Sequence, residues 1–426
     1  MKKMTLAMLG TLACLAAAAA EFAVTPDRQI PVYRAGEKAI VTVSVQENGA
    51  PLTEGIIQYE ITNDGRAQLA SGSIDLAKAN PAQITVSMDQ PGIARLTLKP
   101  GAIKVTNKVD NKRPSPTSCG LAFSPEKLTY AGDIPKDFVK FWMDGRKAIA
   151  NRPVKLTPLP SKSKDINVFK VVVDSLNGPV YGYLAVPSKP GKYPAAITVP
   201  GAGPGSPGPD LVFAQKGYIT LVMNVHEYET PTDAQKAKEI YAEQGKRFNY
   251  PTKNAHDRDT YFFRRVILGV DRAINHVASM KEYNGREMIM YGSSQGGAMT
   301  LIMTGLNKNI TVCAANVPAM CDHLGVAGVR PEGWPHALPK ASAETAQDVA
   351  RTMPYFDAAN FATFIKVPAF VSCGLIDGTC PPSSVFVAYN RLGTKTKQMY
   401  YMPGLGHVQT NDYVKARDAW FQKFAR

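Results

Sequence analysis

Residues 291–297 of this chain read Tyr-Gly-Ser-Ser-Gln-Gly-Gly, and the predicted fold is built around them. An apolar run at residues 288–290 precedes them, and a helix-like run at residues 298–303 follows. Gly-x-Ser-x-Gly between a strand and a helix is typical of a nucleophile elbow, a sharp turn that exposes a serine hydroxyl and leaves helical N–H groups free for an oxyanion. An ordinary glycine-rich turn is the alternative reading. In this context the sequence favours Ser294 as a nucleophile.

An acid and a histidine follow the serine in the order that this architecture requires. A strand predicted at residues 368–374 leads to Asp377, and a strand predicted at residues 398–402 leads to His407. Asp377 precedes a glycine, so a simple turn aspartate remains an alternative. A surface-loop histidine is the alternative for His407. The sequence predicts the set Ser294, Asp377 and His407 as catalytic.

The glycine-rich loop at residues 201–208 has two readings. Residues 203–208 match Gly-x-Gly-x-x-Gly after a strand, the pattern of a dinucleotide site. The prolines within it remove N–H donors that a pyrophosphate needs, and no helix starts at the glycines. In an α/β-hydrolase the same position supplies an oxyanion donor. We therefore predict an oxyanion hole formed by the backbone amides of Ala202 and Gln295, and no cofactor.

Composition places the chain among ordinary globular proteins. Its 426 residues are enough for two or three domains, with 45% hydrophobic and 20% charged residues. The formal net charge is +14, but Lys and Arg are scattered and no nucleic-acid-binding motif is present, which argues against nucleic acid as a partner. A solvated basic surface is the default reading, and attraction to an acidic polysaccharide is the alternative.

The first twenty residues have the pattern of a secretory signal peptide. Lys2 and Lys3 precede an apolar stretch, and alanines at 18–20 form a cleavage site after Ala20. A secreted or periplasmic location follows, with a lipoprotein attached through Cys14 as the less favoured alternative. Beyond this segment no stretch is apolar and long enough to cross a membrane, so the cleaved chain is expected to have no integral membrane segment.

Five cysteines remain after such a cleavage, at positions 119, 313, 321, 373 and 380. The odd number leaves at least one thiol unpaired within the chain. Cys373 and Cys380 flank Asp377 and could be bridged, although the sequence does not establish connectivity. The Cys and His spacings do not resemble a zinc site, so no metal is expected.

The chain is expected to contain two structural units after residues 1–20. Residues 21–109 alternate apolar and polar positions between turn residues, which predicts a small all-β, immunoglobulin-like sandwich in an accessory role. Residues 110–119 are rich in proline and serine and are predicted as a linker. Strands and helices alternate over 120–426, which predicts a doubly wound α/β-hydrolase sheet as the catalytic domain.

From about Phe123 to the C-terminus, the chain resembles the acetylxylan esterase / cephalosporin C deacetylase group, carbohydrate esterase family seven of the α/β-hydrolase superfamily. The form Ser-Gln-Gly-Gly after Gly292 and the pairing of Asp377 with Cys-Pro-Pro are more specific than a generic elbow. A secreted bacterial branch of the group, with an N-terminal β-sandwich, is the nearest in pattern. The residues that carry the resemblance are 137–138, 141–142, 292–297, 316–322, 333–335, 377, 380–382 and 406–407.

The resemblance implies a serine carboxylester hydrolase that removes acetyl groups from acetylated xylan, xylo-oligosaccharides or similar acetylated sugars through an acyl-enzyme. The family's Arg-Gly-Gln motif is replaced here by residues 225–228, Val-His-Glu-Tyr. His226, Glu227 and Trp334 are therefore candidates for a substrate pocket whose shape differs from the family's. The family's hexamer is not carried over, and a homo-oligomer stays open.

Other function classes remain open on the sequence alone. An esterase for a different acyl group or a serine peptidase would use the same Ser294, Asp377 and His407. A non-catalytic carbohydrate-binding protein would leave this set unused.

Overall fold

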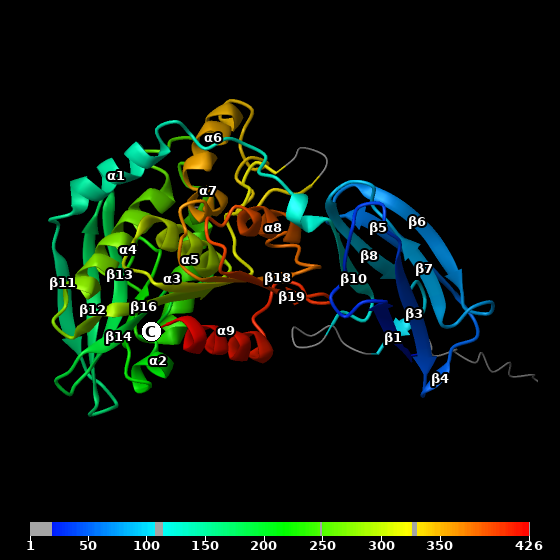
Figure 1. The fold of residues 1–426 in the computed structure, drawn as a ribbon, viewed down its shortest axis with the longest axis horizontal. Helices are drawn as coiled ribbons and strands as arrows, with labels where there is room; N and C mark the ends of the chain where they lie inside the picture. Colours follow the sequence, from blue (N-terminus) through cyan, green and yellow to red (C-terminus); the bar gives the residue numbers. More distant parts are fainter. Residues whose placement is uncertain (1–18, 107–113, 248, 326–329, 426) are drawn as a thin grey trace, which may run out of the picture.

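The computed structural model describes residues 19–106, 114–247, 249–325 and 330–425. These residues form two five-stranded sheets from the N-terminal part of the chain and one nine-stranded sheet from the remainder. Figure 1 shows the two small sheets together at one end of the molecule, and the large sheet with its helices at the other. The predicted combination of a β-sandwich followed by an α/β sheet is confirmed.

Ten strands form the sandwich. They are β1 (Ala19–Pro26), β2 (Val32–Tyr33), β3 (Ala39–Glu47), β4 (Ala50–Pro51), β5 (Ile56–Asn63), β6 (Gln68–Asp75), β7 (Ala82–Val86), β8 (Gly92–Lys99), β9 (Lys104–Val105) and β10 (Ser118–Phe123). One sheet has the order β4-β3-β1-β9, with β7 on β3, and the other has the order β2-β10-β8-β5-β6. Every second residue of β3, from Val41 to Val45, is buried between the sheets with Leu96 and Leu98 of β8.

The last sandwich strand, β10, extends into the segment predicted as a linker, 110–119. It pairs with β8 along its whole length. Its side chains alternate: Cys119, Leu121 and Phe123 belong to the sandwich core, whereas Ala122 packs into the core of the large sheet. The Pro- and Ser-rich residues before it conceal this short alternation in the sequence. Where the chain divides into domains stays a prediction, but β10 itself is shared by both cores.

The large sheet has the order β11-β12-β13-β15-β14-β16-β17-β18-β19. Its strands are β11 (Val154–Leu159), β12 (Ile166–Ser175), β13 (Gly178–Pro187), β14 (Tyr193–Thr198), β15 (Ile219–Met223), β16 (Tyr283–Ser293), β17 (Val312–Asn316), β18 (Ala369–Gly374) and β19 (Lys397–Met402). In this order the strands from β11 to β15 pair antiparallel with their neighbours, and those from β15 to β19 pair parallel. Because the carboxyl ends of these parallel strands share one edge, the loops after β16, β18 and β19 meet there.

Helices cover both faces of the large sheet (Figure 1). They are α1 (Phe138–Ile149), α2 (Leu211–Gln215), α3 (Ala234–Arg247), α4 (Phe262–Ser279), α5 (Gln295–Leu306), α6 (Ala346–Thr352), α7 (Ala358–Ala362), α8 (Pro382–Asn390) and α9 (Asn411–Phe424), with 3₁₀ turns η1 (Pro125–Lys127), η2 (Tyr250–Thr252) and η3 (Met353–Tyr355). Met288 and Met290 of β16 share a core with α4 and α5, whereas Ile289 and Tyr291 pack with α9 on the other face. Burial on both faces explains why these strands are continuously apolar in sequence.

Most of the predicted signal segment, with Cys14, lies outside the described residues. Ala19 and Ala20, which precede the predicted cleavage point, are the first two residues of β1. Among the described helices, none combines the length and apolar character that a membrane-spanning helix needs.

Candidate active site

The turn at Ser294 joins β16 to α5. Ser294 has φ 59° and ψ −120°, a backbone conformation that is strained for a residue with a side chain. The Ser294 N–H donates to the carbonyl oxygen of Asn316 at 2.9 Å. Glycines make the turn sterically feasible, because a Cβ on Gly292 would lie 2.5 Å from the Gly296 carbonyl and one on Gly296 would lie 2.0 Å from the Val199 oxygen.

Gly296→Ala is expected to lower the free energy of unfolding by about 3 kcal/mol, because the added methyl group would meet the rigid backbone of β14's carboxyl end. Thermal or urea unfolding measures the change. Gly208→Ala is the matched control, since a Cβ at Gly208 meets nothing within 4 Å. Equal unfolding midpoints for the two variants would contradict the steric argument.

The three residues predicted as catalytic lie within hydrogen-bonding distance of one another. His407 Nε2 is 2.8 Å from Ser294 Oγ, and His407 Nδ1 is 2.8 Å from Asp377 Oδ2. Asp377 follows β18 and His407 follows β19, so the shared edge of the sheet brings them to the elbow. The Asp377 side chain is 1% exposed and that of His407 is 26% exposed, and Ser294 is also partly exposed. The three residues are therefore open to solvent at the serine and histidine end and closed at the aspartate end.

Backbone N–H groups fix the other oxygen of the Asp377 carboxylate. Asp377 Oδ1 accepts hydrogen bonds from the N–H groups of Thr379 (2.8 Å) and Cys380 (2.9 Å). The carboxylate is therefore oriented so that only Oδ2 faces His407. If the neutral His407 ring carries its proton on Nδ1 and donates it to Asp377 Oδ2, its Nε2 is unprotonated and can accept the proton of the Ser294 hydroxyl.

The same residues form a group of potential metal ligands in the described part of the chain. One atom each of Asp377, Cys380 and His407 lie within 4.8 Å of one another. Burial, with the negative charge of Asp377, raises the pKa of the Cys380 thiol well above its usual value, so this thiol stays protonated at neutral pH. Both His407 nitrogens already have hydrogen-bond partners. This donor set is therefore better suited to proton transfer than to metal binding.

All five cysteines in the described residues are buried free thiols. The bridge considered between Cys373 and Cys380 is not formed. Burial raises the pKa of each thiol, which suppresses the reactive thiolate.

The loop predicted to carry the second oxyanion donor passes directly beside the elbow. A Cβ on Gly201 would lie 3.4 Å from the Ser293 carbonyl oxygen and 3.8 Å from Ser294 Cβ. Ala202 follows it, and Gln295 is the first residue of α5, where N–H groups have no partner within the helix. No helix begins at the glycines 203–208, since α2 starts only at Leu211. The loop therefore lacks the helix N-terminus of a dinucleotide site.

The buried Gln295 side chain ties this loop to a neighbouring segment. Its Nε2 donates to the Pro200 carbonyl oxygen at 3.2 Å, and its Oε1 accepts from the Tyr250 hydroxyl at 2.8 Å. Tyr250 was not singled out from the sequence, because it lies 45 residues before Gln295 in a short 3₁₀ turn with no recognisable motif.

Tyr250→Phe is expected to lower the free energy of unfolding by about 1–3 kcal/mol, because Gln295 Oε1 would be left buried without a donor. The elbow and the loop predicted to carry the second oxyanion donor would also lose a shared anchor, so we expect a fall in kcat of about tenfold. Urea unfolding and steady-state turnover kinetics check both effects. Tyr413→Phe is the matched control, because Tyr413 is a buried tyrosine on α9 that does not line the cavity beside Ala202, and its hydroxyl has no hydrogen-bond partner among the described residues.

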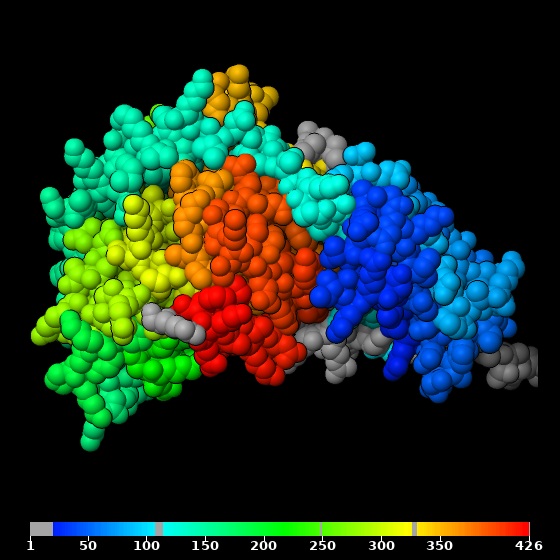
Figure 2. All heavy atoms as spheres, viewed as in Figure 1, coloured from blue at the N-terminus to red at the C-terminus, as the bar shows by residue number. Residues whose placement is uncertain are grey.

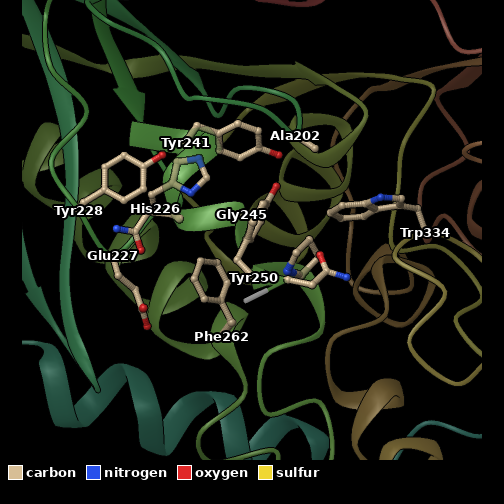
Figure 3. A pocket seen from close by; sticks show the side chains of 12 residues that line it. Ala202, His226, Glu227, Tyr228, Tyr241, Gly245, Tyr250, Phe262 and Trp334 are labelled. Atoms are coloured by element: carbon tan, nitrogen blue, oxygen red, sulfur yellow. The ribbon is translucent and has the colours of Figure 1, made fainter. Parts of the chain in front are cut away.

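A cavity of about 320 Å³ adjoins this loop at Ala202 and is lined by Tyr250, which binds the Gln295 side chain, whereas Ser294 and His407 are not among its lining residues. Ala202 and all three predicted pocket residues, His226, Glu227 and Trp334, line it. Figure 3 shows Trp334 on one side of the cavity and the rings of His226 and Tyr228 on the other. The remaining lining residues are Tyr228, Tyr241, Gln244, Gly245, Asn249, Tyr250, Pro251 and Phe262.

His226 supports the glycine-rich loop at residues 201–208 from within the cavity wall. Burial lowers the pKa of His226, with Arg265 contributing, so the ring is neutral at pH 7. Its Nε2–H donates to the Gly203 carbonyl oxygen at 2.7 Å, and its ring stacks on Tyr228 with 4.8 Å between centroids. Glu227 instead forms an ion pair with Lys253 at 2.7 Å at the partly exposed rim. The segment that replaces Arg-Gly-Gln therefore builds the pocket wall.

The fold and the site define an α/β-hydrolase: a strained serine turn follows β16, an acid follows β18 and a histidine follows β19. The chain belongs to the acetyl xylan esterase (AXE1) family, whose pattern matches residues 126–424. It is accordingly an esterase, an acetyl ester hydrolase, as the resemblance implied.

Known relatives agree with this assignment. The chain is 30% identical over 440 residues to the acetyl esterase Axe7A of Xylanibacter ruminicola, covering 99% of this chain and 97% of that protein. Two solved structures share the fold: acetyl xylan esterase 1 from Thermoanaerobacterium sp. JW/SL YS485 (TM-score 0.59, 19% identity) and an acetyl xylan esterase from Paenibacillus sp. R4 (TM-score 0.57, 24% identity). Each match covers 70% of this chain; it covers 97% of the Thermoanaerobacterium chain and 98% of the Paenibacillus chain.

Proposed function

We propose that this esterase works through an acyl-enzyme on Ser294. His407 Nε2 takes the proton from Ser294 Oγ as the oxygen attacks the ester carbonyl, and the same proton then goes to the leaving alkoxide. Water attacks the acyl-enzyme with His407 again as base, which releases acetate and regenerates the serine. Asp377 orients the imidazole and stabilises its charged form. The observation that carries this proposal is the pair of 2.8 Å contacts that His407 makes with Ser294 and Asp377.

The oxyanion of the tetrahedral intermediate would be held by the N–H groups of Gln295 and Ala202. Their support is indirect: Gln295 begins α5, where the helix dipole favours a negative charge, and Gly201 brings the loop against the elbow. Preorganised donors of this kind contribute about 10²–10³ in kcat. The anchors from Tyr250 and His226 keep these two backbone segments in place.

Acetylated xylan, acetylated xylo-oligosaccharides and similar acetylated sugars are the proposed substrates. The family and the aromatic lining of the cavity support this class, since sites for small organic ligands combine aromatic walls with a few polar groups. The volume of about 320 Å³ is at the low end of the ~300–1,000 Å³ range for such sites, which favours a single sugar unit in the cavity.

The decisive measurement is acetate release from acetylated xylan, from acetylated xylo-oligosaccharides and from small acetyl esters, with the Ser294→Ala variant as control. Feruloyl esters and peptides are the comparison substrates. Release of acetate from sugars in preference to the other groups supports the proposal. A peptide or a larger acyl ester turned over faster than every acetylated sugar would refute the substrate assignment and leave the mechanism standing.

An extracytoplasmic location, secreted or periplasmic, is part of the same proposal. It rests on the signal-like residues 1–20, with cleavage expected after Ala20. N-terminal sequencing of the protein recovered from outside the cytoplasm tests it.

A further inference from the structure

The sandwich contacts the two loops that carry Asp377 and His407. Strand β10 runs so close to the first loop that a Cβ on Gly120 would lie 2.2 Å from the Leu375 carbonyl oxygen. The Ser115 N–H donates to the Gly404 carbonyl oxygen of the second loop at 2.7 Å. Figure 1 places the carboxyl ends of β18 and β19 next to the sandwich, and Figure 2 shows its blue and cyan atoms against the orange and red C-terminal atoms.

Arg95 reaches from the sandwich to the backbone of Asp377. It lies on β8, and its Nη2 donates to the Asp377 carbonyl oxygen at 2.9 Å. The same Nη2 is 3.3 Å from Asp64 Oδ1, and the Arg95 side chain is only 17% exposed. This hydrogen bond is charge-assisted and shielded from solvent, which makes it stronger than an ordinary surface contact.

Asp64 holds the other end of the same loop. Its side chain is fully buried, and its Oδ2 accepts from the N–H of Ser383, in the first turn of α8, at 3.0 Å. Asp64 is itself fixed in the turn between β5 and β6, where its N–H donates to the Ile93 carbonyl oxygen at 2.7 Å. The segment from Asp377 to Ser383 is therefore clamped at both ends by one ion pair of the sandwich.

The same turn also contacts the segment that leads to Trp334. Arg66 Nη2 contacts both carboxylate oxygens of Glu332, at 2.6 and 2.7 Å, and Glu332 is 8% exposed. Glu332 lies two residues before Trp334, which lines the cavity. The β5–β6 turn thus contacts both the segment that carries Asp377 and the segment that precedes Trp334.

We propose that Arg95 and Asp64 are positioning residues of the active site. Through them the sandwich holds the loop at residues 377–383, here called the acid loop, where Asp377 can hydrogen-bond to His407. The sandwich is then more than an accessory module. Inside the loop, Thr379 and Cys380 orient the carboxylate; from outside, Arg95 and Asp64 fix the backbone that carries them. This inference rests on the proposed role of Asp377.

Arg95→Met in the full-length protein is expected to lower kcat for a small acetyl ester by about 10- to 100-fold, because a displacement of about 1 Å in a catalytic group has that effect. KM is expected to stay within about twofold, since Arg95 is not among the residues that line the cavity. The rate of Ser294 labelling by a fluorophosphonate is expected to fall with kcat. Arg95→Lys, which keeps one donor for the Asp377 carbonyl, should recover part of the loss. Asp64→Asn should cost less, about 3- to 10-fold, because its amide oxygen still accepts from Ser383.

Lys99→Met is the matched control. Lys99 lies on the same strand, and its ion pair with Glu60 is exposed and away from the acid loop. This variant is expected to have the kcat of the unmodified enzyme. Kinetic constants are expressed per folded protein, with thermal unfolding measured for each variant.

An unchanged kcat for Arg95→Met would overturn the inference, and so would a loss of kcat that Lys99→Met reproduces. If Arg95→Met does not fold, Arg95→Lys decides: a lower kcat with an unchanged KM supports positioning, and normal kinetics refute it. Ser294→Ala separates this inference from the proposed function. If Ser294→Ala retains activity the function fails, whereas an inactive Ser294→Ala beside a fully active Arg95→Met removes only the role of the sandwich.

Discussion

Replacing Ser294 with alanine is expected to lower kcat/KM for acetyl esters by at least about 10⁴-fold. The hydroxyl lies 2.8 Å from His407 Nε2, and without it the imidazole loses the nucleophile that it is proposed to activate. The residual rate would come from the oxyanion donors and the pocket, which the substitution leaves in place. Acetate release measures the loss, and a fluorophosphonate probe should no longer label the protein.

Ser293→Ala is the matched control for this experiment, because the adjacent serine has the same side chain and a different environment. Its hydroxyl donates to Gln409 Oε1 at 3.0 Å and accepts from the Asn316 side chain. We expect this variant to keep most of the activity. Near-normal turnover by Ser294→Ala, or loss of turnover only in Ser293→Ala, would refute the assignment of the nucleophile.

Asp377→Asn is expected to lower kcat by about 10⁴-fold while the protein stays folded. The two N–H donors of Thr379 and Cys380 require an acceptor at the Oδ1 position, so the amide oxygen must point there. The amide NH₂ then faces His407 Nδ1, which has to become an acceptor. The ring proton moves to Nε2, where it blocks removal of the serine proton.

The measurement is single-turnover kinetics of the Asp377→Asn variant, with thermal unfolding as the check on folding. Asp412→Asn serves as the control, since Asp412 is exposed at the start of α9 and forms an ion pair with Lys415. Activity of Asp377→Asn within tenfold of the unmodified enzyme would show that His407 does not depend on this carboxylate for its tautomer.

Residue order was enough to predict which side chains meet at the elbow. Each of Ser294, Asp377 and His407 directly follows an apolar strand, and parallel strands bring such positions to one edge of the sheet. The Gly-Ala-Gly loop at residues 201–203 could be placed beside the serine by the same rule. The strands of the sandwich were recognisable because one face is buried and the other is not.

Contacts between distant segments could not be predicted in this way. Arg95 occupies an ordinary polar position in an alternating strand, and its partner lies 282 residues further along the chain. Asp64 forms part of an Asn-Asp-Gly stretch that reads as a turn, which it also is. Nothing in the local sequence pattern distinguishes a turn carboxylate that faces solvent from one that is buried against a helix far along the chain. The contact between Tyr250 and Gln295 could not be predicted for the same reason.

Strand β10 limits how this enzyme can be recombined with its relatives. Its odd-numbered side chains complete one hydrophobic core, its Ala122 belongs to the other, and its Gly120 leaves no space for a side chain beside Leu375. A crossover placed inside β10 would mismatch both cores at once. A chimera that exchanges the N-terminal sandwich would have to transfer β10 together with the loops that it contacts, so the sandwich and the large sheet are matched parts rather than interchangeable ones.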